Sequence, residues 1–68
     1  MSDTAKVIEL VGRSDESWEH AAQMALNNAE ETIEEIQGIE IISQTANVED
    51  GEIQSYKSTV HVTFALKQ

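Results

Sequence analysis

Cysteine and proline are both absent from this chain of 68 residues, and each absence excludes something. Without cysteine the chain can form neither a disulfide nor a thiolate metal site. Without proline nothing in the sequence forces a strand or a helix to stop early. A chain of this length buries only about 60% of the surface its unfolded form exposes. Small domains without disulfides usually gain stability from a metal or from oligomerisation, and we expect self-association here, with hard-cation binding as the other route.

Basic residues are also scarce, with four Lys and Arg against thirteen Asp and Glu and a formal net charge of −9. Nucleic acids and anionic membranes are bound through patches of Lys and Arg, so we expect neither as a partner. The acidity fits a solvated surface, cation binding or a medium of high salt. Copies of so acidic a chain would repel one another in an assembly, and salt or bound cations would relieve that repulsion.

Long apolar runs and catalytic motifs are missing as well. No stretch of 18 apolar residues predicts a membrane span, and no signal peptide is apparent, so we expect a cytoplasmic protein. The three glycines are isolated and cannot form a phosphate-binding loop. No Ser, His and acid arrangement implies a triad, so we expect no catalytic residues and no enzyme. Residues 1–68 are expected to form a single domain.

The strongest pattern present lies near the C-terminal end, where Glu52 to Leu66 predicts one long β-strand. At about 3.4 Å per residue it would run roughly 50 Å, which a domain of this size cannot cover by itself. Part of it must stay exposed as an open edge or pair with another copy, and we expect the second. The apolar residues that alternate with polar or small ones along it are Tyr56, Val60, Val62, Phe64 and Leu66.

A helix is predicted from about Asp15 to Ile36. Ser14 is the expected cap of its N-terminus, and Gly38 is the expected left-handed residue that ends it. Its opposite face is acidic and has no Lys or Arg to form ion pairs along the helix. The apolar stripe that predicts the helix consists of Trp18, Ala22, Ala25, Ala29, Ile33 and Ile36.

Two further strands are predicted, at Lys6–Val11 and from Ile39 to about Asn47. The dipeptide Asp50-Gly51 favours a tight hairpin turn between the second strand and the long third one. The order is therefore β-α-β-β, in the α+β class. Placing the third strand between the other two gives a three-stranded antiparallel sheet that partly wraps one helix.

Four glutamates near the end of the predicted helix are candidate metal ligands. On a helix, Glu30 with Glu34 and Glu31 with Glu35 would lie one turn apart, and such pairs can share Ca²⁺ or Mg²⁺. The alternative interpretation is a solvated acidic face.

Two aromatic side chains also allow two interpretations. Trp18 lies on the apolar stripe, where packing is favoured over stacking on a ligand. His61 lies on the more polar side of the long strand, where contact with water or another subunit is favoured over metal ligation. A symmetric ring of His61 or Lys57 side chains around an axis is a further option.

Taken together, these features resemble the dodecin family along nearly the whole chain. No single motif is strong, whereas the combination of length, element order and endings is fairly specific. The residues that carry the resemblance are Lys6–Gly12, Ser14, Ser17-Trp18, the Ala-rich helix, Glu40-Ile41, Glu49–Gly51, Tyr56 and Val60–Phe64.

The resemblance implies twelve copies in a hollow particle that binds flavins, either riboflavin or FMN, near its three-fold axes. In the family a Trp at the start of the second strand stacks on the flavin, and a Gln in the third strand bonds its polar edge. Here Gly38 and Lys57 stand at those positions. Glycine offers no ring, and lysine donates hydrogen bonds but accepts none. The start Ser17-Trp18-Glu19 is similar to a calcium-binding subgroup, which implies Ca²⁺ as a ligand.

Two hypotheses for function follow. In the first, the chain is a dodecin-like homododecameric binding and storage protein for a small ligand or for cations, without the usual flavin contacts. In the second, the hollow particle itself is the function, and it holds no specific ligand.

Overall fold

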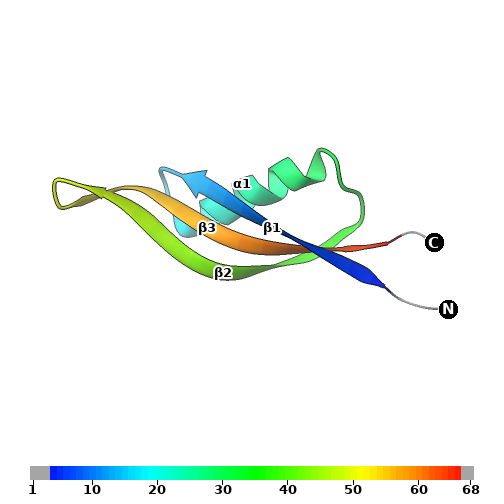
Figure 1. Cartoon of the computed structure of the whole chain (residues 1–68). Coiled ribbons are helices and arrows are strands. Elements are labelled where there is room, and N and C mark those ends of the chain that lie inside the picture. The colour runs from blue at the N-terminus through cyan, green and yellow to red at the C-terminus, as the bar shows by residue number, and fades with distance from the viewer. Residues whose placement is uncertain (1–3, 67–68) are drawn as a thin grey trace.

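The computed structural model of the protein describes residues 4–66. Its elements follow the predicted β-α-β-β order, and β3 lies between β1 and β2 in one antiparallel sheet. Figure 1 shows α1 over one face of that sheet, with the β2–β3 hairpin reaching well beyond it. Within these residues no helix is long and apolar enough to cross a membrane. The elements are β1 (Ala5–Ser14), α1 (Trp18–Glu30), β2 (Ile36–Glu49) and β3 (Glu52–Ala65).

The long third strand is confirmed almost to the residue, since β3 has 14 residues and ends one position before the predicted end. Its alternation also has the predicted effect. Val60 and Val62 are 0% exposed and lie in the core with the helix, while the residues between them point to the other face. Period-2 alternation is what a strand with one covered face requires.

The core beneath α1 is made of small side chains. Four buried alanines line the face of the helix that packs on the sheet, where they meet Val60 and Val62. The backbones approach so closely that a Cβ added to Gly12 of β1 would lie 1.9 Å from the carbonyl oxygen of Ala21. The predicted apolar stripe is therefore confirmed at its alanines, and the close packing depends on glycine at one point of the sheet. The four alanines are Ala21, Ala22, Ala25 and Ala29.

The predicted start of the helix is wrong by one turn. Ser17, rather than Ser14, is the N-cap, and its side chain accepts a hydrogen bond of 3.0 Å from the backbone N–H of His20. β1 extends to Ser14, past the predicted end at Val11. Ser14 caps the turn between strand and helix instead, because its Oγ accepts a hydrogen bond of 2.9 Å from the backbone N–H of Glu16.

The predicted end of the helix is also wrong, because α1 stops at Glu30 rather than at Ile36. The last turn has no basic residue and ends on Glu30, with Glu31 as the cap, and the negative end of the helix dipole disfavours carboxylates there. Ile36 opens β2 instead and pairs with Phe64 of β3, so the apolar stripe continues as a strand. Ile33, in the connection, still packs against the core.

Gly38 does not end the helix. It lies within β2 opposite Thr63, beside an irregularity in the strand register, and β2 begins earlier and ends later than predicted. The left-handed backbone conformation falls instead on Glu35, with φ of 60°. The predicted hairpin turn is confirmed, with positive φ at both Asp50 and Gly51.

Trp18 joins the start of the helix to both long strands. Its indole Nε1 donates a hydrogen bond of 2.8 Å to the carbonyl oxygen of Thr45 in β2. Its own carbonyl oxygen accepts one of 2.7 Å from Ser58 Oγ in β3. Its ring meets that of Tyr56 edge to face, with centroids 4.8 Å apart. The predicted packing role is confirmed, and the bond to β2 adds a contact that helical spacing does not reveal.

One prediction concerns the close approach at Gly12. Gly12→Ala should lower the free energy of unfolding by about 1–3 kcal/mol, because the new methyl meets backbone that has little room to move. Gly38→Ala is the matched control, since nothing lies within 4 Å of a Cβ there, and it should change stability by less than about 0.5 kcal/mol. Urea unfolding followed by circular dichroism measures both, and equal effects would contradict this account of the packing.

A second prediction concerns the Trp18 indole. Trp18→Phe removes the hydrogen bond to Thr45 and should cost about 1 kcal/mol of stability. Tyr56→Phe is the control, because it keeps the ring contact and removes a hydroxyl that forms no hydrogen bond within residues 4–66. Thermal melts monitored by circular dichroism compare the two variants. A larger loss in Tyr56→Phe would show that the indole bond to β2 is not what matters.

Candidate functional site

The face of the sheet that α1 does not cover, called here the helix-free face, carries the candidate binding residues. Residues directly opposite one another in an antiparallel sheet point to the same face. Val60 and Val62 face the helix, so Lys57, Thr59, His61, Thr63 and Ala65 of β3 point to the helix-free face together with their partners in β1 and β2. This face is where a ligand or a second copy can reach the sheet.

A row of three polar residues crosses the middle of the helix-free face. His61 lies opposite Glu9 of β1 on one side and Glu40 of β2 on the other. Its Nε2 lies 2.9 Å from Glu9 Oε1, and its side chain is 35% exposed. The predicted position of His61 on the polar side, open to water, is confirmed, and a subunit contact there stays a prediction. The sequence alone does not reveal the contact with Glu9, because the two residues are 52 positions apart.

Gly38 and Lys57 also lie on the helix-free face but far from each other. Gly38 pairs with Thr63, six residues along β3 from Lys57. At about 3.3 Å per residue that separation is roughly 20 Å. A single copy therefore does not bring the two positions together. A flat ligand in contact with both would have to lie between copies of the chain.

The four candidate glutamates do not share a helix face. Glu30 is the last residue of α1, Glu31 caps it, and Glu34 and Glu35 lie in the connection to β2. The predicted spacing of one helical turn therefore does not exist. Among residues 4–66 no group of three or more His, Asp or Glu side chains lies close enough to hold a metal ion. Their role as cation ligands stays a prediction that one copy does not complete.

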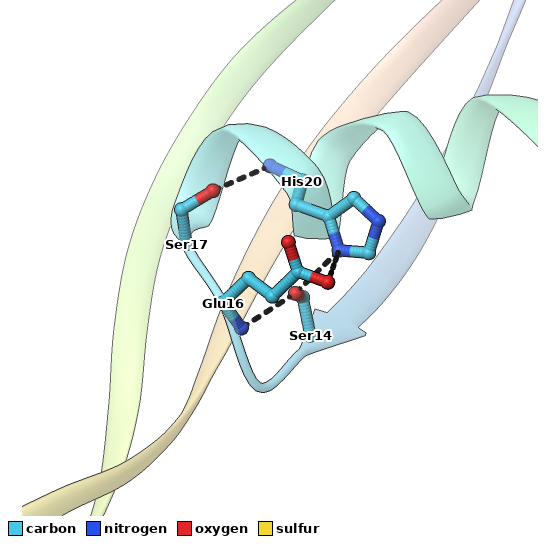
Figure 2. A network of polar contacts seen from close by, with 4 residues as sticks. All are labelled: Ser14, Glu16, Ser17 and His20. Carbon is cyan, nitrogen blue, oxygen red and sulfur yellow. Dashed lines mark hydrogen bonds and ion pairs between the residues drawn. The ribbon is translucent and has the colours of Figure 1, made fainter.

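A polar network that the sequence did not predict joins β1 to the start of α1 (Figure 2). Ser14 Oγ lies 2.6 Å from Nδ1 of His20, and Glu16 Oε2 lies 4.0 Å from the same nitrogen. In a hydrolytic triad the nucleophile and the acid use different ring nitrogens, whereas here both address one. Ser14 is also buried, at 6% exposure. The network is suited to holding the strand-to-helix turn rather than to nucleophilic attack.

An open hollow of about 490 Å³ lies beside this network. Arg13, Asp15, Glu16 and Met24 contribute to its lining. Its lining carries both signs of charge, and His20 contributes an imidazole and Met24 a single apolar side chain. Its shape and lining do not define a specific ligand.

The comparisons with known proteins agree with this geometry. The Dodecin family model matches residues 4–67. The calcium dodecin of Mycobacterium tuberculosis (strain ATCC 25618 / H37Rv) is 31% identical over 62 residues, which cover 91% of this chain and 87% of that protein.

Solved structures match closely as well. The tt0972 protein from Thermus thermophilus superposes with a TM-score of 0.93 at 28% identity, covering 98% of both chains. The structure of the calcium dodecin from M. tuberculosis, described as calcium chelating with a novel calcium-binding site, gives a TM-score of 0.81 at 32% identity. It covers 94% of this chain and 91% of that one. With β3 central, one helix on one face and a matching family model over nearly all residues, this chain belongs to the Dodecin family.

Proposed function

We propose that this protein is a non-catalytic binding protein that assembles as a homododecamer and holds cations, calcium first among them, rather than flavin. The observation that carries the proposal is the open surface at Gly38, where nothing lies within 4 Å of a Cβ position. The resemblance to flavin-binding dodecins places a stacking Trp there. Without a ring, a flat ligand loses its main contact at this position.

The other aromatic residues do not replace that ring. Within residues 4–66, Trp18 and Tyr56 pack on each other at the start of the helix, and Phe64 shares the side of the sheet that faces α1. None of them lies on the helix-free face beside Gly38. Lys57, at the position of the flavin-bonding Gln, supplies donors only. These features support a ligand other than flavin.

Charge and relatives together support a cation. The formal net charge of −9 favours cations over anions at any site that gathers several copies. The calcium dodecin of M. tuberculosis is 31% identical in sequence comparison and 32% identical in structural comparison, over most of the chain. Ca²⁺ takes about 6–8 oxygen ligands, which is more than a single residue pair can offer.

We place the proposed cation ligands at the connection from α1 to β2. Glu30, Glu31, Glu34 and Glu35 follow one another there in a segment that is neither helix nor strand at its centre. Calcium accepts the irregular geometry of such segments more readily than magnesium does. Within residues 4–66 of one copy, no group of acidic side chains lies close enough to hold a metal ion by itself. The calcium ligands that these glutamates do not supply would therefore come from neighbouring copies or from water.

Self-association is supported by the surface that one copy leaves uncovered. Apolar side chains on all three strands are more than one third exposed, and a small domain gains from covering them. A site between copies also follows from the separation of Gly38 and Lys57. The exposed apolar residues of the strands are Val7, Val11, Ile39, Ile41, Ile42, Val48 and Ile53.

The second candidate function is a hollow particle without a specific ligand. It is favoured because, within residues 4–66, no group of three or more His, Asp or Glu side chains lies close enough to hold a metal ion. In that case the carboxylates only solvate the particle, and cations screen its charge without occupying defined sites.

Calorimetric titration with Ca²⁺ separates the two candidates. We expect saturable heat at a defined stoichiometry for the wild type. Glu34→Gln with Glu35→Gln should weaken binding by about tenfold or more, equivalent to about 1.4 kcal/mol. Glu16→Gln with Glu19→Gln, at the other end of α1, removes the same charge and should leave the affinity within about twofold. A featureless wild-type titration would favour the particle without a ligand, and equal weakening in both variants would remove the glutamates of the connection as ligands.

Riboflavin titration tests the flavin part of the proposal. The purified wild type should be colourless and should not quench riboflavin fluorescence at micromolar concentration. Gly38→Trp with Lys57→Gln should gain quenching, because stacking adds on the order of 1 kcal/mol beyond the apolar area it buries. Gly38→Ala with Lys57→Gln is the control without a ring. Tight quenching by the wild type would contradict the loss of the flavin site.

A further inference from the structure

Two cations face each other on the helix-free face, and within residues 4–66 neither of them forms an ion pair. Arg13 of β1 and Lys57 of β3 are direct partners in the strand register. They are two of only four Lys and Arg residues in a chain with thirteen carboxylates. Like charges directly opposite in a sheet are destabilising, so some opposite charge should lie nearby. Among residues 4–66 both ion pairs involve a histidine, and neither Arg13 nor Lys57 takes part in one.

The surroundings of this pair do not supply that charge. Thr45 is the β2 partner of Lys57, and the next row toward the middle of the sheet holds Val11, Thr59 and Ser43. The nearest carboxylates on the same face lie in the row of His61, four residues along β3 and about 13 Å away. That distance exceeds the Debye length of about 8 Å at physiological salt.

The turn after β1 does not supply it either. Asp15 and Glu16 share the open hollow with Arg13, yet neither carboxylate forms an ion pair with its guanidinium, and Lys57 does not line that hollow. We call Arg13, Lys57 and the exposed Val11 beside them the cationic patch.

We propose that the cationic patch of one copy binds the β2–β3 hairpin tip, residues 48–53, of a second copy. This inference rests on the self-association in the proposed function and names one of its contacts. The tip carries Glu49, Asp50 and Glu52 within four residues, all exposed and with no basic residue among them. The negative charge of the tip is therefore complementary to the positive charge of the cationic patch.

A copy cannot satisfy its own patch in this way. Glu52 and Lys57 lie five residues apart on the same continuous strand, which is about 17 Å of extended backbone. The strand holds the tip away from the patch of its own chain. Figure 1 shows the hairpin extending past the helix and past β1, so the tip is free to reach another copy.

Exposed apolar side chains also lie next to the charges in both segments. Val48 and Ile53 are strand partners next to the turn and are 64% and 52% exposed. On the receiving side Val11 is 62% exposed. An interface of apolar contact with opposite charges beside it is the usual composition of specific protein contacts. Because the tip and the patch are different surfaces, the contact is heterologous, and repeated copies of it form a ring if the rotation between copies closes.

Charge reversal tests the contact in the full chain. Arg13→Glu with Lys57→Glu, and separately Glu49→Lys with Glu52→Lys, should each shift assembly in sedimentation velocity at low salt. We expect the protein concentration at half-assembly to rise by at least about tenfold. Combining all four substitutions returns the formal net charge to −9 and should restore assembly. Lys6→Glu, which changes a cation outside the patch, should assemble as the wild type does. Circular dichroism checks that each variant is folded.

The outcomes separate this contact from the function proposed above. A wild type that assembles, together with reversed variants that assemble equally well, would overturn the contact and leave the binding function standing. A combined variant no better than its two parents would also overturn it. If the variants assemble normally but lose saturable binding of inorganic phosphate, the patch holds a small anion and the contact with the tip is wrong. A wild type that stays a single copy would overturn the contact and the proposed assembly together.

Discussion

One helix of 13 residues packs on strands of 14, and most properties of this fold depend on that mismatch in length. The helix spans about 20 Å, whereas a strand of that length spans more than about 45 Å. Small side chains let the helix lie close to the sheet, with Gly12 beneath Ala21 as the tightest point. The core is therefore compact but short. Among residues 4–66, none covers the hairpin beyond the helix or the helix-free face.

The uncovered surfaces are also where the candidate site residues lie. Gly38, Lys57 and the row of Glu9, His61 and Glu40 all belong to the helix-free face. The two positions that the family resemblance assigns to one ligand are roughly 20 Å apart in one copy. A ligand that contacts both positions would therefore need more than one copy, so its binding would depend on assembly. The acidic connection after α1 also points to a site between copies, since residues 4–66 of one copy offer too few clustered oxygens for a calcium ion.

Much of the fold follows from the sequence, because period-2 alternation and an Asp-Gly turn are strong local signals. β3, the hairpin turn and the central place of β3 are predicted on these grounds. The C-terminal end of the helix is not predicted correctly, because Ile33 and Ile36 keep a helical spacing in the sequence. In the structure Ile36 pairs with Phe64 of β3 instead. Ser14 and Ser17 have the same chemistry as caps, and only the actual length of β1 decides between them.

The candidate site was less predictable, for a physical reason. The contacts of His61 with Glu9 and of Trp18 with Thr45 join residues 52 and 27 positions apart, and they depend on strand register. The pairing of Arg13 in β1 with Lys57 in β3 also depends on strand register. The pairing of glutamates failed because it assumed a helix that the unfavourable charges at its end do not sustain. Family resemblance identified Gly38 and Lys57, and the structure adds only how far apart they lie.

The most direct test of the account is the native mass of the wild-type protein, measured by sedimentation at low and at high salt. The account predicts one assembled species at high salt, with a mass about twelve times the 7.5 kDa of one chain, and weaker assembly at low salt where carboxylates repel more strongly. A folded single copy at every ionic strength would contradict it.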